Sequence, residues 1–316
     1  MLRIIAEGIV YRLLGLSHES KLASAVEFFI YDSLKIFVLL FALIAVIGFM
    51  RTYVKQDKIK KWLSGKGILA NFYAALFGAV TPFCSCSSIP LFMGFIKGGI
   101  PLGVAFSFLI TSPLINEYLV VLMLGFFGVK ITVLYVLTGM LLGIFSGLII
   151  GKMNLGGNLV QGFVSGEKED VVDYSTLKER AFYGLSEAIG IIKKIWVWVL
   201  AGVGVGAFIH NYIPQEAVQA AIGRTGIFSV PIAVLLGVPM YGSCAAIVPV
   251  AVVLFNKGVP LGTALSFMMA IAALSLPEAI MLRRVMNLSL IAIFFGITAL
   301  GIIFIGYLFN LLQIIV

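Results

Sequence analysis

Residues 98–108 read GGIPLGVAFSF, and residues 257–267 read KGVPLGTALSF. The two stretches are 159 positions apart, and this offset aligns the chain with itself without a gap from about residue 30 to about residue 108. Glycine and proline keep the offset, as in Gly78 with Gly237 and Pro90 with Pro249. Apolar residues often match by chance, whereas glycine and proline at a fixed spacing over a long stretch do not. The sequence therefore predicts two copies of one structural unit.

The composition indicates that lipid is the main solvent of this chain. Of its 316 residues, 61% are hydrophobic and only 11% are charged, and the mean hydropathy is +1.12. Soluble domains carry about a quarter charged residues. We therefore expect an all-α polytopic membrane protein embedded in a lipid bilayer. The net charge of +8 does not indicate nucleic acid, because the basic residues lie in short loops between apolar stretches.

Apolar runs and charged runs divide the chain into four parts. We expect an interfacial amphipathic segment at residues 1–27, a first membrane repeat at 28–151, a charged linker at 152–187 and a second membrane repeat at 188–316. Each repeat holds about five helical segments. One pair of segments in each repeat is short and forms a broken or re-entrant helical hairpin.

Loop charges predict that the two repeats are inverted relative to each other. Residues 51–66 contain six basic residues, whereas the counterpart loop at 210–225 has Arg224 as its one lysine or arginine. Basic loops face the cytoplasm, so the first loop is expected inside and the second outside. This arrangement places the linker in the cytoplasm and the protein in the inner, cytoplasmic membrane.

The predicted hairpin tips carry all three cysteines. Residues 81–90 read TPFCSCSSIP and residues 239–249 read PMYGSCAAIVP, so the offset places Cys84 on Ser243 and Ser85 on Cys244. A helix break within the membrane survives only inside protein or beside a water-filled cavity. Inverted repeats place such breaks at a shared site near the midplane. We therefore expect Cys84, Cys86 and Cys244 to lie close together.

Thiolates at such a site have two possible uses. They bind soft metals and metalloids, or they exchange with disulfides. The candidate set is Cys84, Cys86 and Cys244 for thiol binding, redox chemistry or a soft-metal site, with Ser85, Ser87, Ser243 and Asn116 as substrate-binding neighbours. The alternative is that these small residues pack helices together and are chemically inert.

Two acidic residues lie within apolar stretches. Glu117 ends the run Thr111-Ser112-Pro113-Leu114-Ile115-Asn116-Glu117, and Glu278 follows Pro277. An acid in a membrane helix usually lines a polar path and can carry protons. Both are therefore candidates for proton coupling. The alternative is an interfacial position or a pairing with a backbone group, especially for Glu278, which is close to Arg283.

The motifs resemble the signature of ArsP-type permeases, also described as YraQ-like. The resemblance rests on residues 81–90, on Gly98-Gly99-Ile100-Pro101-Leu102-Gly103 and on Thr111-Ser112-Pro113-Leu114-Ile115-Asn116, and it covers nearly the whole chain. It implies efflux of trivalent organoarsenicals such as methylarsenite. It also implies membrane cysteines as ligands, which here would be Cys84, Cys86 and Cys244.

Three functions remain open at this stage. The first is a secondary transporter of small thiol-reactive substrates, driven by an ion gradient or a partner because the sequence has no nucleotide-binding loop. The second is an intramembrane thiol oxidoreductase that would use the same cysteines with a thiol-redox partner protein. The third is a channel for soft metals or small anions. We expect no bound cofactor, and the sequence leaves the oligomeric state open.

Overall fold

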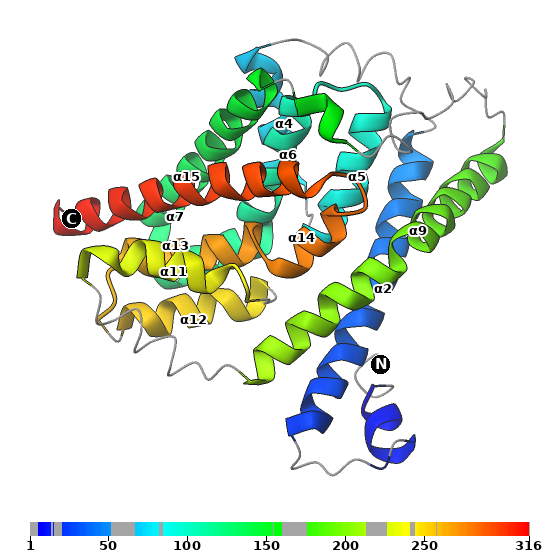
Figure 1. Ribbon diagram of the computed structural model, residues 1–316, viewed down its shortest axis with the longest axis horizontal. Coiled ribbons are helices and arrows are strands. Elements are labelled where there is room, and N and C mark those ends of the chain that lie inside the picture. The colour runs from blue at the N-terminus through cyan, green and yellow to red at the C-terminus, as the bar shows by residue number, and fades with distance from the viewer. Residues whose placement is uncertain are drawn as a thin grey trace.

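The computed structural model describes residues 6–13, 15, 21–51, 67–81, 85–153, 155–159, 176–212, 226–240, 244–256 and 258–315. Helices make up almost all of this part of the chain (Figure 1). After the π-helix η1 (Gly8–Leu13), the first half contains α2 (Lys21–Arg51), α4 (Ile68–Val80), α5 (Ser85–Lys97), α6 (Leu102–Leu114) and α7 (Glu117–Lys152). The second half contains α9 (Leu177–Tyr212), α11 (Ser229–Gly237), α12 (Cys244–Asn256), α13 (Leu261–Ala273), α14 (Leu276–Leu282) and α15 (Leu288–Ile315), with short 3-10 turns at η2 (Leu155–Asn158) and η3 (Gly226–Phe228).

Helix boundaries recur at the offset that the sequence predicted. Both bounds of α5 return in α12, and both bounds of α6 return in α13, 159 positions later. The chain reverses after α5 at Gly99 and after α12 at Gly258, with φ angles of 75° and 87° that favour glycine. At each turn the third residue beyond the helix end donates to a carbonyl of the last turn, Ile100 N to Phe95 O (3.0 Å) and Val259 N to Leu254 O (3.1 Å).

The fifth helical segment of each half is broken near its start. In α7 the break is a kink at Gly128, where φ is 78° and ψ is 174°. The counterpart of Gly128 is Asn287, which lies in the gap between α14 and α15. Thus α14 and α15 together correspond to the single helix α7.

Helices α6 and α13 form the centre of the molecule. All residues of α13 and those of α6 from Gly103 onward are buried. Glycines bring neighbouring helices close to this centre. A Cβ atom on Gly78 of α4 would lie 3.1 Å from Phe108 O, and one on Gly237 of α11 would lie 3.1 Å from Phe267 O. Such small-residue contacts replace the hydrophobic driving force that is missing between helices in lipid.

The outer surface is apolar, as a membrane protein requires. An exposed stripe at every fourth residue of α7 consists of Val133, Leu137, Leu141, Phe145 and Ile149. Three helical stretches in the described part are long and apolar enough to cross a bilayer, namely Leu119–Lys152, Leu261–Leu282 and Leu288–Gln313. The structure therefore confirms the prediction of an all-α polytopic membrane protein.

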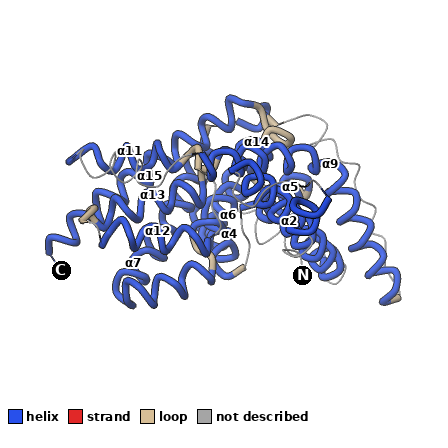
Figure 2. The backbone as a smooth tube through the Cα atoms, turned by 90° about the horizontal axis from the view of Figure 1, so that it is seen from below, coloured by secondary structure: helices blue, strands red, loops and turns tan. Residues whose placement is uncertain are grey.

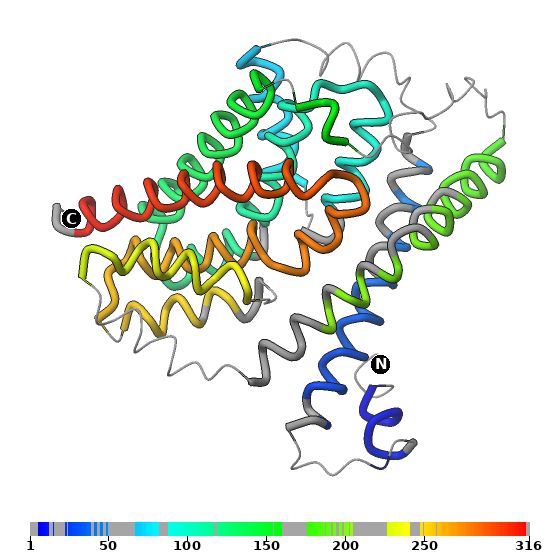
Figure 3. The backbone as a smooth tube through the Cα atoms, in the orientation of Figure 1, coloured from blue at the N-terminus to red at the C-terminus, as the bar shows by residue number. Residues whose placement is uncertain are grey.

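Helices α2 and α9 form a pair beside the remaining bundle (Figures 1 and 2). A Cβ atom on Gly184, near the start of α9, would lie 2.9 Å from Phe49 N, near the end of α2. Gly204, near the end of α9, faces the ring of Phe29, near the start of α2, at 3.5 Å. The two helices therefore run antiparallel, and Figure 3 lets the reader follow their opposite courses.

Both helices of this pair begin before the apolar runs that predicted them. The predicted repeats start at residues 28 and 188, whereas α2 begins at Lys21 and α9 at Leu177. In α9 the reason is a capping box, in which Glu179 N donates to Thr176 Oγ1 (3.4 Å) and Thr176 N donates to Glu179 Oε2 (3.3 Å). This cap starts the helix inside the predicted linker.

Candidate functional site

The two predicted hairpin tips are helix breaks that end at equivalent residues. Helix α4 ends at Val80 and α5 starts at Ser85, while α11 ends at Gly237 and α12 starts at Cys244. Ser85 and Cys244 are 159 positions apart, so the breaks end at the same place in each half. The backbone of Cys86 and Ser87 belongs to the first turn of α5. Cys84 and Ser243 lie outside the described residues, as do the side chains of Ser85, Cys86, Ser87 and Cys244.

A buried hydrogen bond joins the two signature motifs of the first half. Ser88 Oγ and Ser112 Oγ are 2.8 Å apart, and both side chains are fully buried. Ser88 belongs to the cysteine motif and Ser112 to the Ser-Pro motif of α6, so the start of α5 is fixed against the end of α6. The sequence motifs contain both serines, but they do not show that the two hydroxyls pair.

The break after α6 is stabilised by a side chain from α7. Pro113 lies in the last turn of α6, and the helix ends one residue later. Tyr135 of α7 is fully buried, and its hydroxyl donates to the carbonyl oxygen of Leu114 at 3.1 Å. A carbonyl at a helix end inside the membrane needs such a partner. The half-buried Asn116 follows directly, and α7 starts at Glu117, whose side chain lies outside the described residues.

The breaks of the second half meet through the backbone. Leu276 N, at the start of α14, donates to Val238 O, at the end of α11, at 2.9 Å. Glu278 follows in the first turn of α14 and is fully buried. The structure therefore places this acid inside the protein.

Each cysteine-bearing helix contacts an acid-bearing helix of the other half. Helix α5 packs against α14, and α12 packs against α7. Across the second contact, the rings of Phe127 and Phe255 lie with their centroids 5.9 Å apart. The structure thus shows contacts across the two halves between the helices that carry these residues. In the described part, no group of three or more His, Cys, Asp or Glu could hold a metal ion, and most of the cysteine site lies outside that part.

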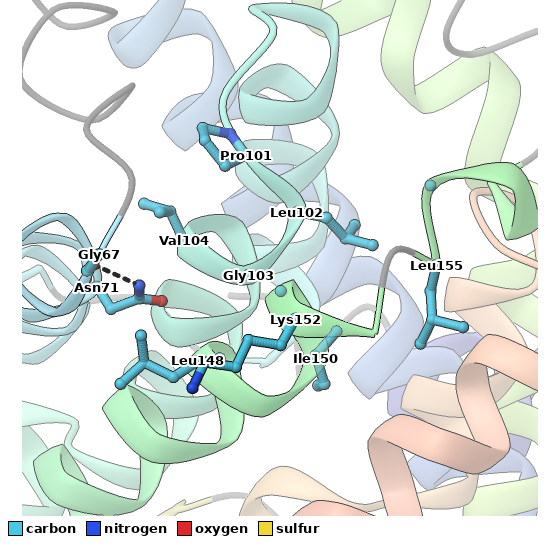
Figure 4. A pocket seen from close by; sticks show the side chains of 13 residues that line it. Gly67, Asn71, Pro101, Leu102, Gly103, Val104, Leu148, Ile150, Lys152 and Leu155 are labelled. Atoms are coloured by element: carbon cyan, nitrogen blue, oxygen red, sulfur yellow. Dashed lines mark hydrogen bonds between the residues drawn. The ribbon is translucent and has the colours of Figure 1, made fainter.

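A cavity of about 570 Å³ lies elsewhere, where α4 and α6 begin and α7 ends (Figure 4). Its lining includes Gly67, Asn71, Gly103, Gly151 and Lys152. The Asn71 amide donates to Gly67 O at 2.8 Å, and Ser107 Oγ donates to Asn71 Oδ1 at 2.7 Å. The break lies at the other end of α4, roughly 20 Å away at 1.5 Å per residue. The cavity is therefore separate from the predicted cysteine site, and its lining includes Pro101, Leu102 and Gly103 of the Gly98–Gly103 motif.

Comparisons with known proteins agree with the membrane fold. The chain is 27% identical over 210 residues to a protein of Streptococcus mutans named "Putative two-component membrane permease complex subunit", with 63% of this chain and 66% of that protein covered. The match thus spans slightly less than two thirds of that relative. A Bacillus subtilis protein, "UPF0718 protein YcgR", is 24% identical, with 63% of this chain and 68% of the relative covered. The "UPF0718 protein MJ0584" of Methanocaldococcus jannaschii is 22% identical, with 74% and 80% covered.

No solved structure gives a significant match. The model of the family ArsP_1, described as "Predicted permease", matches residues 21–311, which is nearly the whole chain. This match confirms the resemblance that the cysteine and Ser-Pro motifs indicated. The chain belongs to the ArsP_1 family of predicted permeases.

Proposed function

We propose that the protein is a secondary transporter that exports a small thiol-reactive solute, with trivalent organoarsenicals as the substrate class. The observation that carries this proposal is the matched start of α5 and α12. Ser85 and Cys244 begin these helices at equivalent positions, and Cys84 and Cys86 flank Ser85. Two helix starts of this kind, one from each half, form a site where several thiolates share one soft ligand.

The direction of α2 and α9 supports an inverted repeat. These helices are counterparts at the start of the two halves, and they run antiparallel. The loop charges favour the same inversion, with residues 51–66 in the cytoplasm. We therefore place the chain in the cytoplasmic membrane with its two halves oriented oppositely.

The acids supply a means of coupling transport to a proton gradient. Helix α14 carries the buried Glu278 and contacts α5, while α7 begins at Glu117 and contacts α12. In our proposal, protonation of a cysteine sulfur breaks its bond to arsenic while water takes the vacated place on arsenic, and these carboxyl groups carry the protons. A relative is named as a subunit of a two-component permease complex, so we extend the proposal to a second membrane subunit as partner.

Uptake into everted membrane vesicles tests the transporter. With methylarsenite as probe, vesicles with the intact protein accumulate arsenic, whereas Cys84→Ser, Cys86→Ser and Cys244→Ser each reduce the initial rate at least tenfold. Met153→Ser is the matched control, because it removes a sulfur atom at an exposed position beyond the bundle core. Size-exclusion profiles in detergent confirm folding. A fully active Cys84→Ser protein overturns the cysteine site.

The same vesicles discriminate transport from thiol redox chemistry. Free thiols are counted after oxidation and after reduction of the intact protein. Unchanged thiols together with arsenic accumulation support the transporter. A reversible disulfide between Cys244 and either Cys84 or Cys86, without arsenic flux, overturns it in favour of the oxidoreductase.

A further inference from the structure

The bundle around α6 and α13 has an internal two-fold relation. Leu142 of α7 and Gly301 of α15 are counterparts at the 159-residue offset, and a Cβ atom on Gly301 would lie 3.5 Å from Leu142 Cγ. Counterpart residues touch each other only where a two-fold axis passes nearby. The contact of α5 with α14 and the contact of α12 with α7 are related by the same exchange of halves.

The α2–α9 pair has a two-fold relation of its own. Gly184 lies against Ala45, and Gly204 lies against Phe29. The counterparts of Ala45 and Phe29 are Gly204 and the fully buried Ala188. Exchanging the two halves turns the contact of Gly184 with Ala45 into one of Ala25 with Gly204, which is one helical turn from the observed contact of Gly204 with Phe29, so the antiparallel pair maps onto itself to within one turn.

The pair nevertheless sits on one side of the bundle. Helix α9 packs along α14 and α2 contacts α5, as Figures 1 and 2 both show. The counterpart contacts are α2 with the start of α7 and α9 with α12, and they are marginal at most among the residues described. If the two-fold axis of the α2–α9 pair coincided with that of the bundle, each of these contacts would be as extensive as its counterpart in the other half. The α2–α9 pair is therefore displaced from the axis of the bundle.

The displacement has a matching difference in exposure. Val121 in the first turns of α7 is 66% exposed, whereas its counterpart in α14, Ile280, is partly buried. The surface that stays open on the α7 side is apolar, with Leu124 and Phe126 also exposed. Apolar surface passes between lipid contact and protein contact without desolvating polar groups.

We infer that the α2–α9 pair has a second docking position on the start of α7 and on α12, generated from the observed one by the two-fold relation of the bundle. The exchange between the two positions moves the pair from its contacts with α5 and α14 to the equivalent contacts with α12 and the start of α7, which is the rocking motion that inverted repeats permit. This inference rests on the proposed transport function for its purpose, but its geometry stands on the contacts alone.

Distances between spin labels test the second position. In a background with the three cysteines replaced by serine, labels are attached at Trp196→Cys on α9 and Val253→Cys on α12, both exposed positions. We expect two distance populations in lipid nanodiscs, separated by at least one helix diameter, about 10 Å. The control pair, Trp196→Cys with Val46→Cys on α2, gives one population because the α2–α9 pair moves as a unit. A single population for the first pair overturns the inference.

A substitution on the open face gives an independent test. Val121→Trp places a bulky side chain on the second docking surface, so we expect at least a tenfold lower rate of methylarsenite uptake with unchanged size-exclusion behaviour. Val129→Trp, an exposed position on α7 beyond the kink, stays within twofold of the natural protein. Equal activity of both variants overturns the second position. The label distances do not depend on the cysteine site, which fails separately through Cys84→Ser, whereas the uptake of the two tryptophan variants is compared with that of an intact protein that transports methylarsenite.

Discussion

The three packed helices α4, α6 and α7 can be compared with α11, α13 and α15, their counterparts in the second half. The backbone approaches are the same in both sets. A Cβ atom on Gly103 of α6 would lie 2.8 Å from Gly151 Cα of α7, and one on Gly262 of α13 would lie 2.8 Å from Asn310 N of α15. The small residues are therefore a requirement of the packing itself, and each half meets it separately.

The polar contacts differ between the two halves. The hydrogen-bonded serines Ser88 and Ser112 of the first half have the counterparts Ile247 and Ile271. The second half has its own pair elsewhere, since Ser229 Oγ and Thr263 Oγ1 are 2.9 Å apart. The same backbone arrangement thus holds hydrogen-bonded hydroxyl pairs at different positions in the two halves.

The largest loss of stability is expected at the glycines whose backbone contacts are the same in both halves. Gly103→Val and Gly262→Val each force α6 or α13 away from its neighbour, because the new Cβ atoms meet backbone rather than a flexible side chain. We expect each to lower the free energy of unfolding by at least about 3 kcal/mol. Thermal unfolding in detergent measures the loss. Gly125→Ala is the control, since a Cβ atom there meets nothing within 4 Å. If only one of the two substitutions were tolerated, the packing of α6 on α7 and the packing of α13 on α15 would not be equivalent.

A swap of residues tests the two-fold relation of the bundle. Leu142→Gly and Gly301→Leu each change a buried contact and should cost about 2–3 kcal/mol alone. The double variant exchanges the two residues across the axis and re-creates the contact, so we expect a coupling free energy of about 2 kcal/mol in its favour. Additive losses in thermal unfolding would show that positions 142 and 301 are not related by a two-fold axis.

Much of the fold could be predicted because it depends on residues with few conformational options. Gly99, Gly258, Pro101 and Pro260 mark the turns before α6 and α13, and they stand at the repeat offset in the sequence. Periodicity and loop charge could not give the displaced position of the α2–α9 pair. That position depends on long-range contacts between helices, which local sequence patterns do not specify.

The site was predictable at the level of elements and less so at the level of side chains. The motifs located the starts of α5 and α12, and the structure adds that Glu278 is buried. From the sequence alone, an interfacial position was an alternative for this acid because Arg283 is near in the chain. The partnership of Tyr135 with Leu114 O was missed, since a tyrosine in an apolar run carries no signal of which distant carbonyl it reaches.

The serine pair of the first half offers a smaller and more specific effect. Ser88→Ala and Ser112→Ala each remove the buried hydrogen bond between the two hydroxyls, which costs about 1 kcal/mol. The double variant removes both hydroxyls, and a coupling free energy of about 0.6 kcal/mol is typical for such pairs in membranes. Ile247→Ser with Ile271→Ser transfers the pair to the second half, and this double variant should unfold at a higher temperature than either single one. If this double variant were less stable than both single variants, the backbone at positions 247 and 271 would differ from the backbone at positions 88 and 112.

The smallest effect concerns the carbonyl at the end of α6. Tyr135→Phe removes the hydrogen bond to Leu114 O and reproduces the residue of the second half, because Phe294 is the counterpart of Tyr135. We expect a loss of about 1 kcal/mol in the free energy of unfolding. Phe294→Tyr should bring no matching gain, since the second half secures its break through Leu276 N and Val238 O. Equal and opposite changes in the two variants would show that both breaks need a tyrosine, so that the second half would be stabilised in the same way as the first.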